Sequence, residues 1–238
     1  MDNAIYASLT RQSGLMREMQ VIANNIANAD TNGFRREGVV FAEYLAPTGR
    51  GRDALSMGHA HGRVVDLGQA GMTRTGGVWD LAIDGAGFFA VETPEGTRIT
   101  RAGAFMPTPE GELITPDGYR LLDEGQTPVT IPPGAAVIAV GSDGTISADG
   151  GQVGRIGIFA PPPPELMTRA AGTLFAAPAV LEPAPEAGIR QGYLESSNVN
   201  PIAEVTRMIE VQRAFEMGQA LMDREDRRIR DTISALTR

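Results

Sequence analysis

Apolar or small residues recur at alternating steps of four and three at both ends of the chain. The first series comprises Ile5, Leu9, Met16, Met19, Ala23 and Ile26. The second comprises Val205, Met208, Phe215, Met222, Ile229, Ile233 and Leu236. This spacing predicts two helices, each with a narrow apolar seam along one side. Neither seam is wide enough to bury itself, so we expect the two helices to pair as a coiled coil.

Polar residues interrupt both series, at Gln12, Gln212, Gln219 and Asp226. A polar group in a helical seam lowers stability but can fix the register of the partners. We predict that fixing the register is the role of these residues. On this hypothesis, Gln219→Leu keeps or raises helix stability while it reduces correct assembly.

The predicted helices have recognisable ends. The first covers residues 3–29, with Asp2 or Asn3 as its N-cap, and the Asn- and Gly-rich residues 28–33 stop it. Phe34 follows as an isolated large apolar residue, which we expect to fold back onto the seam. The second helix begins after Asn200 and Pro201, which suit the N-cap and the first helical position, and reaches residue 236.

Between the helices the pattern changes twice. Residues 35–77 show no clear helical or strand period and predict an extended arm that lies against neighbouring subunits. From residue 78, short alternating segments are separated by Asp-Gly and Glu-Gly turns, which predicts an antiparallel β sandwich or small barrel. The predicted fold class is α+β. Its parts are an N-terminal helix (1–34), the arm (35–77), a central β domain (78–190) and a C-terminal helix (191–238).

Composition excludes several classes of chemistry. The 238 residues contain no cysteine and no lysine, because all 21 basic residues are arginine. Thiol nucleophiles, disulfides, Schiff bases and a P-loop lysine are therefore impossible. A net charge of −8 argues against broad nucleic-acid binding. Because no run of about 18 apolar residues occurs, we expect no transmembrane helix, and we find no pattern typical of a cleaved signal peptide.

Three signals that suggest a small-molecule or catalytic site are weak. Residues 85–90 match G-x-G-x-x-A, but a turn follows them instead of the helix that a dinucleotide site requires. His59 and His61 are spaced as metal ligands, yet only Asp66 nearby offers a third. The remaining candidates are acidic residues in predicted turns, where turn formation is their ordinary role: Asp84, Glu95, Glu110 and Asp117. We therefore predict no enzyme activity, no metal and no cofactor.

Four segments resemble the signatures of bacterial flagellar rod and hook proteins. They are ANNIANADTNGFR at residues 23–35, DLAIDGAGFF at 80–89, TRAGAF at 100–105 and QGYLESSNVN at 191–200. The resemblance covers both ends and the central module, and it is greatest for the proximal-rod member with one β domain, with the distal-rod member second. It implies a structural subunit of the basal-body rod, exported through the flagellar type III apparatus without a cleaved signal. It further implies assembly across the periplasm into a rod that transmits torque from rotor to hook.

On this resemblance, the functional site is a subunit interface. Its partners are copies of the chain, other proximal-rod proteins and the distal-rod protein. The predicted interface comprises the seam residues and their polar interruptions named above, together with Asn24, Asn25, Asn28, Gly33 and Phe34. The three asparagines either satisfy backbone groups at the helix end or contact a neighbouring subunit.

Two alternatives lie outside the family. One is a soluble binding module that forms a closed oligomer through its terminal helices, and the other is a carbohydrate-active β enzyme. For the free rod subunit we expect both termini to be largely disordered until neighbours cover the seams.

Overall fold

The computed structural model describes residues 2–46, 55–135, 137–178 and 180–236, with side chains described from residue 8 onward except for residues 42–61. The chain forms two compact units. The helical unit comprises Met1–Ala27, Glu37–Val64 and Asn200–Arg238, and the β unit comprises Asn28–Arg36 and Val65–Val199. The chain therefore enters the β unit after the first helix, returns to the helical unit for Glu37–Val64, and comes back to the β unit until the last helix begins.

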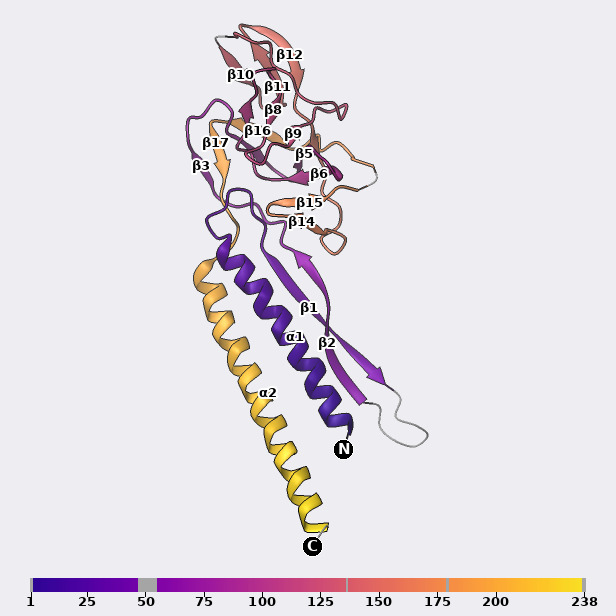
Figure 1. The fold of residues 1–238 in the computed structure, drawn as a ribbon. Coiled ribbons are helices and arrows are strands. Elements are labelled where there is room, and N and C mark those ends of the chain that lie inside the picture. Colours follow the sequence, from indigo (N-terminus) through magenta and orange to yellow (C-terminus); the bar gives the residue numbers. More distant parts are fainter. Residues whose placement is uncertain (1, 47–54, 136, 179, 237–238) are drawn as a thin grey trace. The chain divides into compact units, whose positions relative to one another are not determined.

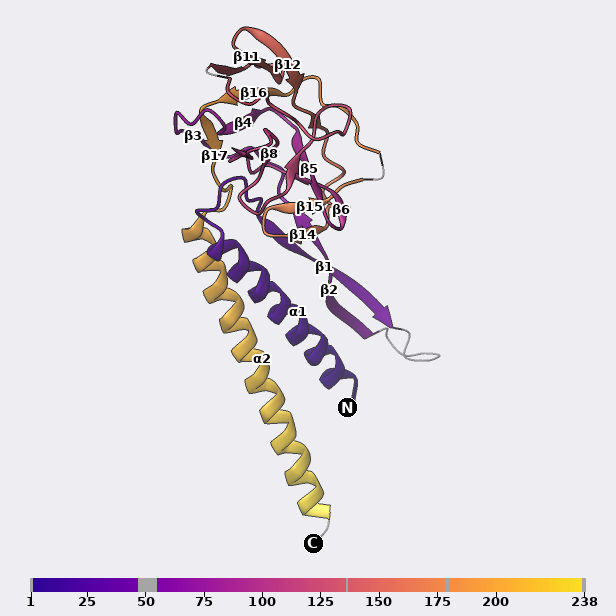
Figure 2. The ribbon, with the colours of Figure 1, turned by 45° about the horizontal axis from the view of Figure 1, so that its top comes forward.

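The helical unit contains α1 (Asp2–Ala27), α2 (Pro201–Leu236) and a two-stranded sheet of β1 (Glu37–Ala46) and β2 (Leu55–Val65). The two helices lie side by side and run in opposite directions (Figures 1 and 2). Asn200 caps α2, since its Oδ1 accepts hydrogen bonds from the backbone N–H groups of Ile202 at 3.1 Å and Ala203 at 3.2 Å. The N-cap and the first helical position predicted from the sequence are confirmed.

Strands β1 and β2 lie in the stretch where the sequence shows no strand period. Val40 and Phe41 are consecutive in β1, and both are exposed. Consecutive residues of a strand point to opposite faces, so these two apolar side chains interrupt the alternation that a half-buried strand shows. The pairing of β1 with β2 is therefore not visible in the hydrophobic pattern.

The β unit contains an antiparallel sheet in the order β14-β15-β6-β5-β9-β8-β7, with β13 also paired to β5. Its strands are β5 (Phe88–Thr93), β6 (Gly96–Thr100), β7 (Met106–Pro107), β8 (Leu113–Ile114), β9 (Arg120–Leu121), β13 (Ile158–Phe159), β14 (Arg169–Ala171) and β15 (Leu174–Ala176). A three-stranded sheet follows the order β10 (Ile138–Val140), β11 (Thr145–Ala148) and β12 (Gly151–Arg155). Two pairs complete the unit: β16 (Gly188–Gln191) with β4 (Leu81–Asp84), and β17 (Tyr193–Glu195) with β3 (Met72–Arg74).

The central strand β5 separates two hydrophobic clusters. Phe89 belongs to a cluster with Leu81 and Ile83, whereas Phe88 and Ala90 belong to a second cluster that also contains Phe175. Successive side chains of a strand point to opposite faces, so β5 contributes to both clusters. The predicted combination of terminal helices with antiparallel β structure between them is confirmed. Among the described residues, no helix is both long enough and apolar enough to cross a membrane.

Candidate assembly interface

The two helices of the helical unit share a small core. Leu15 and Ile22 of α1 are buried with Val211 of α2. The half-buried residues that pack against them are Met19, Ile26, Met208, Ala214 and Phe215. Four of these belong to the predicted seams, but Leu15, Ile22 and Val211 do not. Leu15 and Ile22 repeat at seven residues just as Met16 and Ala23 do, so spacing alone does not show which stripe faces the partner helix.

Several predicted seam residues are exposed in the single chain. Leu9 is 51% exposed and Leu236 is 81% exposed, and Met16, Val205 and Ile233 are exposed as well. Met222 and Ile229 are half-buried. The side chain of Ile5 lies outside the described residues. The helical unit therefore carries apolar side chains along its helices that its own core does not cover.

Of the four polar seam positions, only Gln12 is buried between the helices. Its Nε2 donates to the carbonyl oxygen of Phe215 at 2.9 Å, and its Oε1 has no hydrogen-bond partner among the described residues. Gly218 makes room for this amide, because a Cβ at that position would lie 2.5 Å from Nε2 of Gln12.

The other three polar seam residues are exposed on α2. Gln212 donates to the Glu216 carboxylate one turn further along at 3.2 Å. Asp226 forms an ion pair with Arg230 at 2.7 Å, and Gln219 is also exposed. None of the three contributes to the core between α1 and α2.

Two polar contacts that the sequence analysis missed join the elements of the helical unit. Oε1 of Glu18 accepts from Nε and Nη2 of Arg207 at 2.8 and 2.7 Å. This hydrogen bond is the largest cause of the raised pKa of Arg207. Asn25 Nδ2 donates to the carbonyl of Glu37 at 2.8 Å and to the carboxylate of Glu204 at 3.1 Å. Buried Asn25 therefore joins α1, β1 and α2.

The three predicted asparagines differ in their surroundings. Asn25 also accepts from the backbone N–H of Glu37 at 3.0 Å, so its amide is engaged within the chain. Asn28 is half-buried and accepts from the Thr31 hydroxyl at 3.2 Å, and Asn24 is exposed. A contact of Asn24 or Asn28 with a neighbouring subunit stays a prediction.

A buried charge cluster in the β unit joins three of the signature segments. The Glu195 carboxylate accepts from Arg35 Nη2 at 2.5 Å, from Arg101 Nη1 at 3.0 Å and from the backbone N–H of Ala70 at 2.9 Å. Both arginines and the glutamate are almost fully buried. Burial lowers the pKa of Arg101 to about 10, which the attraction of Glu195 only partly offsets and which the charge of Arg35 reinforces. The cluster thus brings two buried guanidinium groups to one buried carboxylate.

Gly33 and Phe34 directly precede Arg35 of this charge cluster and are also held in the β unit. Gly33 has φ +70, and a Cβ there would lie 2.2 Å from the backbone nitrogen of Ala102. Its N–H donates to the carbonyl of Glu195 at 2.8 Å. Phe34 is fully buried in the β unit, with the Arg169 guanidinium 4.2 Å from the centre of its ring. The predicted packing of Phe34 on the helical seam is therefore wrong, because the side chain is buried in the β unit against Arg169.

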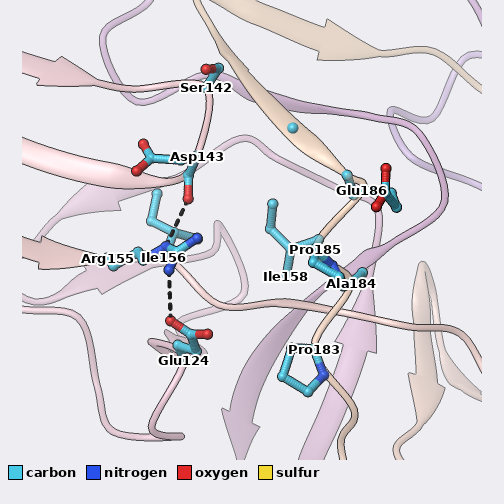
Figure 3. Close-up of a pocket in the computed structure, with 12 residues that line it drawn as sticks. Glu124, Ser142, Asp143, Arg155, Ile156, Ile158, Pro183, Ala184, Pro185 and Glu186 are labelled. Carbon is cyan, nitrogen blue, oxygen red and sulfur yellow. Dashed lines mark hydrogen bonds and ion pairs between the residues drawn. The ribbon is translucent and has the colours of Figure 1, made fainter.

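A pocket in the β unit is lined in part by charged side chains that bond to one another. It has a volume of about 470 Å³ and lies in the β unit, with Glu124, Asp143 and Arg155 among its lining residues (Figure 3). Arg155 donates to the Glu124 carboxylate at 3.2 Å and to the Asp143 carbonyl at 2.9 Å. Hydrogen bonds from Thr145 lower the pKa of Asp143. Arg155 is thus engaged with Glu124 and Asp143, and the Asp143 carboxylate is engaged with Thr145.

The weak signals in the sequence gain nothing further from the structure. Among the described residues, no three His, Asp or Glu side chains gather as a metal site, and the side chains of His59 and His61 lie outside those residues. Gly85 leads into strand β5 and not into a helix. Two of the turn carboxylates form ion pairs, Asp84 with Arg190 and Glu95 with Arg98.

Three family models match successive parts of the chain. Residues 5–35 match the flagella basal body rod protein model, and residues 82–148 match the D1 domain of flagellar hook protein FlgE/F/G. Residues 190–235 match the C-terminal model of flagellar basal body rod FlgEFG proteins. The matches together include both helices and the cluster formed by Arg35, Arg101 and Glu195.

Curated relatives match over almost the whole chain. The flagellar basal-body rod protein FlgF of Caulobacter vibrioides is 41% identical over 231 residues, which covers 94% of this chain and 93% of the relative. FlgF of Mesorhizobium japonicum is 36% identical, covering 93% and 92%. FlgG of Bacillus subtilis is 30% identical over 261 residues, covering 97% and 98%.

Proposed function

The chain belongs to the family of flagellar basal-body rod proteins and is a structural rod subunit most like FlgF, and we propose that it assembles through its terminal helices. The terminal helices pair as a coiled coil within each subunit. Their uncovered apolar side chains then pack against the helices of neighbouring subunits. The partners are copies of this chain and other rod proteins, among them FlgG.

The observation that carries this proposal is the apolar surface of the helical unit. Leu9, Met16, Val205, Ile233 and Leu236 are all exposed, although they occupy the periodic positions of the helices. Fully burying one such side chain contributes ~1.5–3 kcal/mol, so the exposed parts of all five are worth on the order of 5 kcal/mol. Association costs ~4–15 kcal/mol in lost freedom. One pairwise contact is therefore marginal, and a subunit held by several neighbours at once is stable.

The polar seam residues select the correct neighbour in this proposal. Gln212, Gln219 and Asp226 are exposed in the single chain, so they face whichever subunit covers the helices. An amide or carboxylate at such a contact is stable only in the register that gives it a hydrogen bond. Gln219→Leu then leaves the helices intact and reduces correct assembly, and unchanged assembly and motility in that variant would exclude the register role.

The remaining features of the proposal follow from the family. The chain leaves the cytoplasm through the flagellar type III apparatus without a cleaved signal, assembles across the periplasm and transmits torque as part of the rod. It acts without catalysis and without a cofactor. The extended arm (residues 35–77), Asn24 and Asn28 contact adjacent subunits.

The test is to purify intact hook–basal bodies from the source organism and to quantify the chain by mass spectrometry. We expect a small, fixed number of copies per particle that co-purifies with the rod. The copy number relative to the other rod proteins distinguishes a FlgF-like role from a FlgG-like one. Absence of the chain from well-preserved particles would refute the proposal and favour a soluble module that oligomerises through its helices.

A further inference from the structure

A groove runs between α1 and α2 on one side of the helical unit. Its volume is about 250 Å³. Each helix lines it with residues at positions i, i+3, i+4 and i+7, which are Ser8, Arg11, Gln12 and Leu15 from α1 and Ala214, Met217, Gly218 and Leu221 from α2. Each set spans eight residues, which is seven steps or roughly 10 Å along its helix. Two parallel rows of this kind form the holes into which side chains of a third helix pack.

The lining of the groove indicates what it binds. Met217 is 66% exposed and Leu221 is exposed as well, so apolar surface faces outward. Gly218 lets the Gln12 side chain lie close against α2 at the floor of the groove. Gln12 is 7% exposed, and its Oε1 has no hydrogen-bond partner among the described residues. The groove therefore suits apolar side chains accompanied by one hydrogen-bond donor.

The chain itself contains a helical segment of this chemistry. Helix α2 has 36 residues and α1 has 26. Gln12 is level with Phe215 and Gly218, so the end of α1 is level with the start of α2 and the last ten residues of α2 run past α1. Figures 1 and 2 both show this overhang, which comprises residues 227–236.

The overhang matches the groove in length and in chemistry. Ile229, Ile233 and Leu236 occur at i, i+4 and i+7, which places them on one side of the helix. The length of helix that they cover equals the length of each row of groove residues. Ile233 and Leu236 are exposed. Arg230, next to Ile229, pairs with Asp226 through Nη2 and keeps further N–H donors on its guanidinium, while the Gln12 Oε1 is an acceptor.

We propose that the overhang of one copy of this chain lies in the groove between α1 and α2 of the next copy. Ile229, Ile233 and Leu236 pack against Met217 and Leu221, and the Gln12 amide rotates so that its buried Oε1 accepts from the Arg230 guanidinium. The groove and the overhang are different surfaces of one chain, so each added copy leaves one of each unfilled. Such a head-to-tail contact generates a ring or an open helical array. The inference rests on the proposed function, since it names the partner surface within the rod.

Disulfide cross-linking tests the contact directly, because the chain has no cysteine of its own. The variant is Met217→Cys/Ile233→Cys, expressed in place of the native chain, in basal bodies oxidised after purification. The two positions are 16 residues apart on one helix, roughly 24 Å, and a disulfide needs Cα atoms within ~7 Å. Any disulfide therefore joins two copies. The matched control is Asp223→Cys/Ile233→Cys, since Asp223 is exposed and lies about 120° around α2 from Met217.

We expect the Met217→Cys/Ile233→Cys variant to give a ladder of cross-linked multimers, and the control to stay monomeric. A band at the dimer only would overturn the head-to-tail arrangement. A monomer in both variants, with the chain present in the basal bodies, would overturn the contact and leave the proposed function intact. Absence of the unmodified chain from basal bodies would refute the proposed function itself.

A second variant tests the role of the groove without relying on cysteines. Met217→Glu places a charge on an exposed side chain, so the free chain should unfold at the same urea concentration as the native chain. We expect incorporation of this variant into basal bodies to be lost. Normal incorporation of Met217→Glu would contradict the inference.

Discussion

Replacing Glu195 with glutamine should destabilise the β unit by ~3–5 kcal/mol, the cost of removing one partner from a buried ion pair. The Glu195 carboxylate accepts hydrogen bonds from Arg35, Arg101 and Ala70. Glutamine has nearly the same volume and keeps one acceptor oxygen. It removes the negative charge, however, and turns an N–H group toward a guanidinium. Two like charges that are already buried then remain without a counter-charge.

The single tryptophan provides the assay. Trp79 packs against a hydrophobic cluster of the β unit, so its fluorescence reports unfolding of that unit in urea. The matched control is Asp84→Asn, because the Asp84–Arg190 ion pair has side chains that are 46% and 56% exposed. An exposed pair of this kind contributes less than ~1 kcal/mol. If Glu195→Gln lowers the free energy of unfolding by no more than this control does, the charge cluster does not stabilise the β unit.

Three further predictions concern other contacts. Gly33→Ala should lower the free energy of unfolding by more than ~3 kcal/mol in the same assay, because strain at positive φ adds to overlap with the backbone of Ala102. A loss below ~1 kcal/mol would contradict this prediction. Glu18→Gln should lower the free energy of opening α1 by ~1–2 kcal/mol, because the charge-assisted hydrogen bond to half-exposed Arg207 is lost. Hydrogen exchange in α1 should then be faster, and unchanged exchange would refute the prediction. Thr145→Ala should raise the pKa of Asp143 toward its ordinary value in a carboxyl NMR titration, because hydrogen bonds from the threonine favour the ionised form. In the native chain these hydrogen bonds stabilise the loop fully above the ordinary carboxyl pKa, and the stabilisation is lost as pH falls through the lowered pKa. An unchanged pKa of Asp143 in the variant would exclude the threonine as the cause.

The helical seams show how far periodicity reaches. The steps of four and three gave both helices, and Asn200 and Pro201 marked the start of the second. The same steps did not separate Leu15 and Ile22, which pack against α2, from Leu9 and Met16, which are exposed. Two stripes one residue apart have equal spacing, and only the position of the partner helix distinguishes them.

The members of the charge cluster in the β unit were visible in the sequence only as parts of separate motifs. Arg35, Arg101 and Glu195 each stand in a segment that resembles the rod and hook proteins, yet 160 residues separate the first from the last. No local pattern indicates that such distant charges form one buried cluster. The sequence carries no sign that Arg35 and Arg101 are buried, because exposure is the commoner state of arginine.

The sequence by itself determined the helices at both ends, the β structure between them, the absence of thiol and lysine chemistry, and the family through its motifs. These properties depend on residue type and on spacing within one segment. Only the tertiary structure decided which stripe of each helix is covered, where Phe34 and Glu195 lie, and that α2 extends past α1 beside an open groove. These properties depend on contacts between residues far apart in the chain, whose energies arise only when the segments come together.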